Sequence, residues 1–361
     1  MSTKLLFLLP SPRKATTSLE ELISRHQIYV RKFIELQKTA PTMPWVIIGD
    51  NLVNPLKPSV PDLQLKFVGR LKFSLLRFPY KAIRIMKRSH FKPDLIVAGD
   101  SYLTAIFALM IQRIYAGDAQ IQLSIHGEVG ALTNRGMKSR VKYFLTKVSF
   151  DHANILRFVS NQQMEGFSNK FNLRGKKLLV TPVPINIQSM QSSVTVRDAI
   201  AFVGRIQQER GVSEWIDITK AFPQEQLMVI GDGPLATRMK CELPKAIFTG
   251  LLSNQEVQKK WVGIGALLST APYESYGLAM REALLQGVPV VSRENAGAVE
   301  LAQRYPNLIK LYKHKTQAQQ YLREFLENPL NEKEFEIFKK DFFAQQEESL
   351  IRLAKVWLNE G

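Results

Sequence analysis

The sequence predicts an α/β protein built from two doubly wound domains, each a Rossmann-like parallel sheet with helices on both faces. Short apolar runs alternate with helix-length segments along all 361 residues, and this alternation is typical of β-α-β units and parallel sheets. The apolar runs are nearly continuous, as expected of strands covered on both faces. A polar, Ser/Gln-rich stretch at 186–193 divides the chain into two halves of domain size.

The first half contains a series of apolar runs that we interpret as strands. They are Leu5–Leu9, Val46–Gly49, Leu95–Ala98, Ile121–Ile125, Ile155–Ser160 and Leu178–Val183. Leu19–Leu36 and Ser101–Tyr115 lie between such runs and have the length of helices. This succession predicts that the first half forms one parallel sheet.

The second half repeats the pattern with its own strands and helices. The predicted strands are Ile200–Val203, Leu227–Ile230, Ala246–Phe248, Ala266–Ser269, Pro289–Ser292 and Leu308–Leu311. Val212–Ala221 is a predicted helix, and the chain ends in a helical region near Glu332–Leu358. A second parallel sheet is therefore expected after the dividing stretch.

These patterns set the expected domain boundaries. The first domain is expected at 1–187, a linker at 188–198 and the second domain at 199–339, with a C-terminal helix at about 340–361 packing back onto the first domain. We expect the two domains to face one another across a cleft. Ligands of such folds bind at the carboxyl ends of the strands.

Composition narrows the class of protein. The single cysteine, Cys241, excludes an internal disulfide and a cysteine-based metal cluster. The run from Leu5 to Pro10 is too short for a signal peptide, and the stretch at 102–111 is too short to cross a bilayer. We therefore expect a soluble, cytoplasmic protein, with the inner face of the cell membrane as a candidate peripheral location.

The net charge of +17 is unevenly distributed along the chain. Residues 1–200 hold 29 Lys and Arg against 12 Asp and Glu, whereas residues 201–361 hold 20 of each. A basic half joined to a neutral half indicates that one domain faces an acidic partner, such as nucleic acid, anionic lipid or a phosphorylated acceptor.

Two arginines follow the first strand of the second half. Phe202-Val203-Gly204-Arg205 ends that strand with a glycine turn, and Arg210 comes five residues after Arg205. Two guanidiniums in one loop can bind a diphosphate, because each planar fork pairs with phosphate oxygens. From the spacing alone, a surface loop with solvated arginines is the commoner arrangement.

Further glycine turns and two glutamates follow later strands. Gly231 begins a Gly-Asp-Gly-Pro turn that leads into a helix, and the glycine lets a ligand approach the backbone. Glu274 and Glu282 stand eight residues apart around Tyr276-Gly277-Leu278, where a helix is expected to begin. Unpaired backbone N–H groups at that helix start would bind an anion. Each of these features also occurs in proteins without such a site.

One histidine in the first half is a candidate ligand contact. His126 follows a predicted strand in Ser124-Ile125-His126-Gly127-Glu128. A histidine at that edge can donate a hydrogen bond to a polar ligand. A half-buried structural histidine is an equally good interpretation of the isolated residue.

Taken in order, these motifs resemble the donor-binding domain of retaining GT-B glycosyltransferases of the family-4 type, or glycosyl transferases group 1. The resemblance covers about residues 199–312 and includes Phe248-Thr249-Gly250 and Gly297-Ala298-Val299-Glu300. The first half matches more loosely, at Leu95–Ala98, His126-Gly127 and Phe158-Val159-Ser160. The resemblance implies a GT-B architecture with a first domain that binds the acceptor and a second domain that binds a nucleotide sugar.

The resemblance also implies roles for individual residues. Arg205 and Arg210 would bind the donor diphosphate, Glu274 would orient the transferred sugar, Glu282 would hold the ribose and His126 would contact the sugar near the reacting carbon. Backbone groups of the donor site would be supplied by Tyr276, Gly277, Leu278, Gly204, Gly231 and Gly250. Family members usually carry lysine where Arg210 stands, so the charge is kept while the geometry differs.

The sequence departs from the family pattern in the first half. The family's first loop usually carries Gly-Gly, but this chain has Ser11-Pro12-Arg13-Lys14-Ala15. The strand before the linker often carries Asn-Gly, where this chain has Pro182-Val183-Pro184-Ile185-Asn186. The first departure leaves open the contacts that this loop makes with phosphate or acceptor.

The expected chemistry is metal-independent. The chain has no Asp-x-Asp, the paired carboxylates with which many transferases hold a metal and a sugar nucleotide. Arginines and a helix N-terminus would instead stabilise the leaving diphosphate of a UDP- or GDP-linked sugar, and no cofactor is expected. The resemblance implies retention at the anomeric carbon. We favour front-face attack, since His126 is a poor nucleophile.

The acceptor side is indicated only by charge. The segment 70–92 carries eight basic residues interleaved with apolar ones, a pattern that suits either an anionic lipid surface or a core-packing helix with a solvated basic face. A glycan or lipid-linked acceptor in cell-envelope or polysaccharide synthesis fits this charge, and an anionic membrane surface is a further candidate partner.

Other function classes stay open at this point. A non-catalytic sugar-nucleotide-binding partner subunit is the main alternative to a hexosyltransferase, although the two glutamates and two arginines favour the enzyme. Nucleic-acid binding has only the sequence pI near 9.8 behind it, without a recognisable binding motif. A sugar-nucleotide epimerase on the same architecture would lack the glutamate pair.

Overall fold

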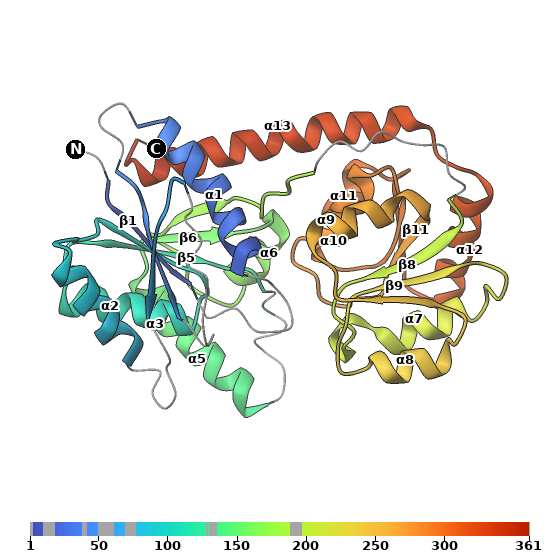
Figure 1. Cartoon of the computed structure of the whole chain (residues 1–361), viewed down its shortest axis with the longest axis horizontal. Coiled ribbons are helices and arrows are strands. Elements are labelled where there is room, and N and C mark those ends of the chain that lie inside the picture. Colours follow the sequence, from blue (N-terminus) through green and yellow to red (C-terminus); the bar gives the residue numbers. More distant parts are fainter. Residues whose placement is uncertain are drawn as a thin grey trace. The chain divides into compact units, whose positions relative to one another are not determined.

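The computed structural model describes the chain except residues 1–2, 10–18, 38–41, 50–60, 69–76, 128, 130–135, 188–196 and 361. Its contacts divide the chain into two compact units, Met1–Pro184 with Gln346–Gly361, and Ile185–Gln345. Most of the expected linker, the loop at 11–15, and residues 70–76 of the basic segment lie outside the described residues. Each unit is an α/β domain with a parallel sheet (Figure 1).

The first unit is a seven-stranded parallel sheet in the order β3-β2-β1-β4-β5-β6-β7. Its strands are β1 (Leu5–Leu9), β2 (Trp45–Gly49), β3 (Gln64–Val68), β4 (Leu95–Ala98), β5 (Gln120–Ser124), β6 (Ile155–Phe158) and β7 (Lys177–Val180). Its helices are α1 (Leu19–Glu35), α2 (Arg77–Arg88), α3 (Leu103–Ile114), α5 (Met137–His152) and α6 (Asn161–Ser168). The strand order turns back at β1 and β4, as in doubly wound folds.

Both faces of this sheet are covered, because alternate residues of each strand point to opposite sides. Leu6 and Leu8 of β1 join a core with α2, α3 and α5, whereas Leu5, Phe7 and Leu9 join a core with α1. The second core also takes in the end of α13 (Glu332–Trp357), whose Trp357 donates its indole N–H to Oε1 of Gln122 at 2.8 Å. The last residues of the chain therefore belong to the first unit.

The second unit has a six-stranded parallel sheet in the order β10-β9-β8-β11-β12-β13. Its strands are β8 (Ala199–Val203), β9 (Leu227–Ile230), β10 (Ile247–Gly250), β11 (Ile264–Ser269), β12 (Val290–Arg293) and β13 (Ile309–Tyr312). Its helices are η1 (Gln208–Arg210), α7 (Val212–Thr219), α8 (Ala236–Glu242), α9 (Asn254–Lys260), η2 (Trp261–Gly263), α10 (Leu278–Leu285), α11 (Ala296–Arg304) and α12 (Lys315–Glu327). Residues of α7, α8 and α12 pack on one face of the sheet.

The predicted fold class is confirmed, and each predicted strand overlaps an observed one. One strand was missed: β3 pairs with β2 at the edge of the first sheet. Four of its residues are exposed or half-buried, so it lacks the continuous apolar run by which the inner strands are recognised. No helix in the described part of the chain has both the length and the apolar content required to cross a bilayer.

Candidate functional site

The carboxyl edge of the second sheet is lined by glycines from neighbouring strands. Gly204, Gly231 and Gly250 lie at the ends of β8, β9 and β10, and backbone hydrogen bonds of 2.9 Å join Gly204 to Ile230 and Gly231 to Gly250. A Cβ on Gly231, whose φ is 135°, would lie 2.0 Å from the carbonyl oxygen of Gly204. A side chain cannot fit there, because the backbone of Gly204 fills the space, so this close approach of the two strand ends requires glycine at 231.

The strand order of this sheet places two loops beside one another. Strands β8 and β11 are neighbours although they are distant in the sequence, and the order turns back between them. Ligands of open α/β sheets bind at such a switch point, outside the carboxyl ends of the strands. The loop after β8 carries Arg205 and Arg210, and the loop after β11 carries Glu274.

The loop after β11 is fixed to its surroundings by hydrogen bonds to its backbone and side chains. Thr270 donates from Oγ1 to the carbonyl of Arg210 at 2.9 Å, and Asn295 donates from Nδ2 to Ala271 at 3.0 Å. The N–H of Gly297 donates to the carbonyl of Glu274 at 2.7 Å. The position of Glu274 is thus set by the loop after β8 and by the start of α11.

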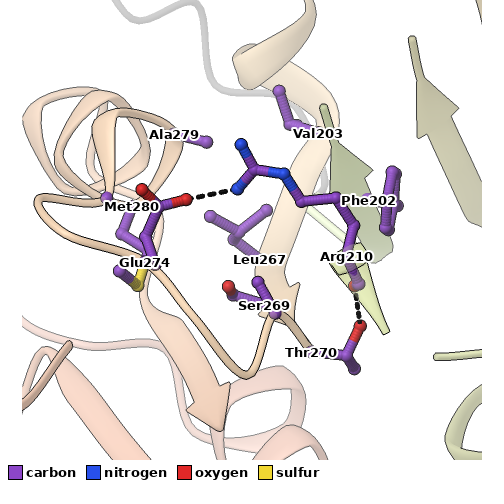
Figure 2. A pocket seen from close by; sticks show the side chains of 11 residues that line it. Phe202, Val203, Arg210, Leu267, Ser269, Thr270, Glu274, Ala279 and Met280 are labelled. Atoms are coloured by element: carbon purple, nitrogen blue, oxygen red, sulfur yellow. Dashed lines mark hydrogen bonds and ion pairs between the residues drawn. The ribbon is translucent and has the colours of Figure 1, made fainter. Parts of the chain in front are cut away.

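Arg210 and Glu274 meet in a pocket at this switch point. The pocket is shallow and opens to solvent. It is lined by Phe202 and Val203 of β8, by Leu267 and Ser269 of β11, and by residues of the following loop and of α10. Figure 2 shows the guanidinium of Arg210 directed across the pocket, where it forms an ion pair with the Glu274 carboxylate. Both side chains are partly exposed, 39% for Arg210 and 22% for Glu274, so an incoming anion can reach the guanidinium.

Helix α10 begins at the rim of this pocket. Gly277 caps the helix in the left-handed conformation, with φ of 74°, and a Cβ there would lie 2.1 Å from Cε of Met280. Within the described residues, the N–H groups of Gly277 and Leu278 donate no hydrogen bond. The first donors of a helix carry a partial positive charge and bind anions.

The remaining predicted residues of this unit lie near the same edge. Glu282 is half-buried on α10, one turn after the pocket residue Ala279 and therefore on the same side of the helix. The ring of Tyr276 does not line the pocket, because it is buried under the guanidinium of Arg281 with 3.6 Å between Cζ and the ring centroid. Arg205 donates to Oε1 of Gln207 at 3.3 Å and does not line the pocket.

His126 lies in the first unit, directly after β5. Its loop is held by Gln163 of α6, which donates from Nε2 to the carbonyl of Gly127 at 2.9 Å. His126 is an exposed residue. Desolvation, together with the charges of Arg157, His26 and Arg25, lowers the pKa of its imidazole. The imidazole is therefore neutral at pH 7 and able to donate or accept a hydrogen bond.

Sequence reasoning missed the groups that hold this site in place. Thr270 and Asn295 anchor the Glu274 loop, and nothing in their isolated residue types distinguishes them from surface polar residues. Arg281 is buried and stands 3.9 Å from Glu300 of α11. Burial raises the pKa of the Glu300 carboxyl, and the charge of Arg281 opposes that rise. The sequence signal that could have identified Arg281 is its position next to Glu282 in a predicted helix.

The described residues contain no cluster of three or more His, Cys, Asp or Glu side chains arranged to hold a metal ion. Of the described residues that line the pocket, Arg210 and Glu274 carry a charge.

Two parallel-sheet α/β domains with these strand orders constitute the GT-B fold. Residues 190–341 match the family model "Glycosyl transferases group 1". This match contains the whole candidate site of the second unit.

Known proteins resemble the chain in sequence locally and in fold along its whole length. A GDP-mannose-dependent alpha-mannosyltransferase of Corynebacterium glutamicum is 31% identical over 102 residues, which is 28% of this chain and 24% of that protein. The chain therefore matches about a quarter of that relative's length.

Two solved structures share the fold at low sequence identity. Sucrose-phosphate synthase of Thermosynechococcus elongatus has a TM-score of 0.72 at 15% identity, covering 98% of this chain and 95% of that one. WaaG, a glycosyltransferase involved in lipopolysaccharide biosynthesis, has a TM-score of 0.71 at 15% identity, covering 99% of this chain and 100% of that one.

Proposed function

We propose that this chain is a glycosyltransferase that moves a hexose from a nucleoside-diphosphate sugar to a glycan or lipid-linked acceptor in cell-envelope or polysaccharide synthesis. The supporting observation is the pocket at the β8–β11 switch point, where Arg210 and Glu274 face one another beside the start of α10. The pocket lies within the segment that matches the group 1 transferase family.

In this proposal the ion pair rearranges when the donor binds. The diphosphate takes the place of the Glu274 carboxylate on Arg210. A guanidinium binds phosphate oxygens bidentately, and the diphosphate carries more negative charge than a single carboxylate. Glu274 then accepts hydrogen bonds from hydroxyls of the sugar. The N–H groups of Gly277 and Leu278 donate hydrogen bonds to phosphate or sugar oxygens, and the Glu282 carboxylate accepts hydrogen bonds from the ribose diol.

Catalysis is proposed to be metal-independent. The bond between the anomeric carbon and the phosphate oxygen breaks, and the leaving nucleoside diphosphate gains negative charge. Arg210, Arg205 and the α10 N-terminus stabilise that charge, a form of electrostatic catalysis in which one donor is worth about 2–4 kcal/mol. Activity that persists in EDTA is the expected result.

The proposed stereochemical course is retention. The acceptor hydroxyl attacks the anomeric carbon from the face that the phosphate leaves, and its proton passes to the departing phosphate oxygen. His126, neutral at pH 7 because of its lowered pKa, would hydrogen-bond the sugar rather than attack it. NMR assignment of the anomeric configuration of the product tests this step, and an inverted product would contradict it.

A donor panel tests the proposal as a whole. Thermal stabilisation and hydrolysis are measured with UDP-, GDP-, ADP- and dTDP-linked sugars in EDTA, for the wild type and for Glu274→Ala. We expect one donor class to stabilise the protein and to turn over, with turnover lost in the variant. If no donor stabilises the wild type, the enzyme proposal is wrong. If a donor stabilises without turnover, the non-catalytic partner subunit is the better account.

A further inference from the structure

Helix α5 carries a ridge of exposed apolar side chains on its first half. Met137, Val141 and Phe144 expose 83%, 52% and 63% of their surface. Their spacing of four and then three residues places them on one face of the helix. The second half of α5 is different, since Thr146, Ser149 and Phe150 are buried against the unit. The ridge therefore projects from a helix that is anchored at its other end.

Basic side chains flank this ridge. Lys138, Arg140, Lys142 and Lys147 are all exposed, and no acidic residue occurs between 136 and 150. The first turn of α5 also lacks an acidic residue, so the positive end of the helix dipole adds to the charge of the lysines. An apolar face bordered by Lys and Arg is the pattern of helices that lie in a membrane interface.

The neighbouring helices extend the same charge. Helices α2, α3 and α5 pack beside one another on one face of the first sheet (Figure 1). Across them stand ten basic residues and a single acidic one, Asp151. The basic members are Arg77, Lys81, Arg84, Lys87, Arg88, Arg113, Lys138, Arg140, Lys142 and Lys147. Each Lys or Arg near an anionic bilayer contributes attraction that falls off within the Debye length.

We propose that the α5 ridge, Met137, Val141 and Phe144 with their basic flanks, docks the first unit on an anionic lipid bilayer. A nucleic acid would account for the charge but not for the apolar ridge. A stable protein partner would account for the ridge, but it needs an interface of about 20–30 residues on each side. A lipid surface fits both, because apolar side chains enter the acyl boundary while lysines remain at the headgroups. This inference deepens the proposed function, on which it rests for its purpose, by naming the surface where a lipid-linked acceptor would be met.

The test is binding of the full chain to vesicles. Co-sedimentation is measured with phosphatidylcholine vesicles and with vesicles that also contain phosphatidylglycerol, at low and high salt. We expect binding to the anionic vesicles alone, and weaker binding at high salt. Val141→Ser/Phe144→Ser should lower the partition coefficient about tenfold or more. The matched control is Ile337→Ser, which changes a side chain of the second unit that is 59% exposed.

A second pair of variants separates the α5 ridge from general charge. Arg140→Gln/Lys142→Gln should weaken binding, whereas Lys259→Gln/Lys260→Gln, which removes two exposed charges from α9, should change it much less. Equal binding to both vesicle types, or α5 variants that bind as the wild type does, would overturn the proposal. So would α5 variants that abolish self-association in sedimentation velocity, or RNA binding that depends on the ridge.

Donor-induced thermal stabilisation is measured on the same variants, so that the two proposals fail separately. We expect the α5 variants to keep the donor response of the wild type while losing vesicle binding. A wild type that binds anionic vesicles but responds to no donor would overturn the proposed function and leave the docking surface in place.

Discussion

Arg210 and Glu274 show at the scale of single residues how the site is arranged. They stand on different loops, and the hydrogen bond from Thr270 to the Arg210 carbonyl joins those loops directly. The Glu274 carboxylate is paired with the Arg210 guanidinium, which is the group that would bind a diphosphate. In the proposed function, the diphosphate and the Glu274 carboxylate compete for Arg210, so removing the carboxylate should leave the guanidinium free for the diphosphate.

Glu274→Gln separates the two roles. The variant removes the carboxylate that pairs with Arg210, so we expect the affinity for a nucleoside diphosphate to stay the same or to increase. The rate of transfer should fall about 100-fold, by analogy with the loss of a single transition-state hydrogen bond. Calorimetric titration and kcat on the same preparation provide the two numbers. A parallel loss of affinity and rate would show that Glu274 helps to hold the diphosphate.

The glycines at the sheet edge yield a matched stability prediction. Gly231→Ala places a Cβ 2.0 Å from a backbone oxygen, whereas Gly250→Ala has open space, with φ of 71°. Gly250→Ala should cost only the left-handed conformation, about 1–2 kcal/mol. Gly231→Ala should cost clearly more, because the backbone of Gly204 must move. Denaturant unfolding measures both, and equal losses would contradict the steric argument.

At the scale of elements, the start of α3 depends on one half-buried carboxylate, that of Asp100. Asp100 Oδ1 accepts hydrogen bonds from the N–H groups of Tyr102, Leu103 and Thr104 at 2.9, 2.6 and 3.1 Å. Burial raises the pKa of the Asp100 carboxyl, and those N–H groups oppose the rise. The cap therefore satisfies donors of the first turn while its own charge is poorly solvated.

Asp100→Asn should retain the side-chain oxygen that accepts these hydrogen bonds and remove the charge. Because the folded pKa of Asp100 lies above its unfolded value, its contribution to stability is complete below pH 3.8 and is lost as the pH rises through the folded pKa. The wild type should therefore gain stability relative to Asp100→Asn as the pH falls from 7 towards 4. Asp100→Ala, which loses the cap, should cost about 0.5–2 kcal/mol at pH 7. Denaturant unfolding at several pH values measures these differences, and a reversed pH trend would contradict the account.

The same scale explains how much the sequence could predict. The inner strands are continuous apolar runs because both of their faces are buried, and each was predicted. Strand β3 was missed because only Val68 of its residues is buried. The loops that carry Arg210 and Glu274 were predicted, but their contact depends on β8 lying next to β11. That neighbourhood is a property of the whole sheet, and no local pattern encodes it.

At the scale of the whole molecule, the chain returns at its end to the unit in which it began. Leu350, Leu353, Ala354 and Trp357 of α13 lie in the core on which α1 and the first sheet pack. Trp357 is 1% exposed, and its indole contacts the rings of Phe7 and Phe33 edge-on. The first unit is therefore completed by residues that are far from its other strands and helices in the sequence.

Trp357→Ala should destabilise the first unit by about 3–5 kcal/mol, the usual cost of removing a buried aromatic side chain. It also leaves Oε1 of Gln122 without the indole donor. Ile337→Ala on the same helix is the control, since its side chain is 59% exposed and its loss should have little effect. Thermal unfolding should show a lowered transition for Trp357→Ala alone. Equal transitions in the two variants would mean that the end of α13 is not part of the core.

The central claim, that the pocket at the β8–β11 edge binds a nucleoside diphosphate through Arg210, is tested most directly by calorimetric titration. UDP and GDP are titrated in EDTA into the wild type, Arg210→Ala and Arg238→Ala. Arg238 is a matched control, because it is also an exposed arginine paired with a glutamate, Glu242. We predict that one nucleotide binds the wild type and Arg238→Ala alike, and that Arg210→Ala weakens its binding about 10- to 100-fold, the worth of a lost hydrogen bond to a charged group. Equal affinity in all three proteins would contradict the account.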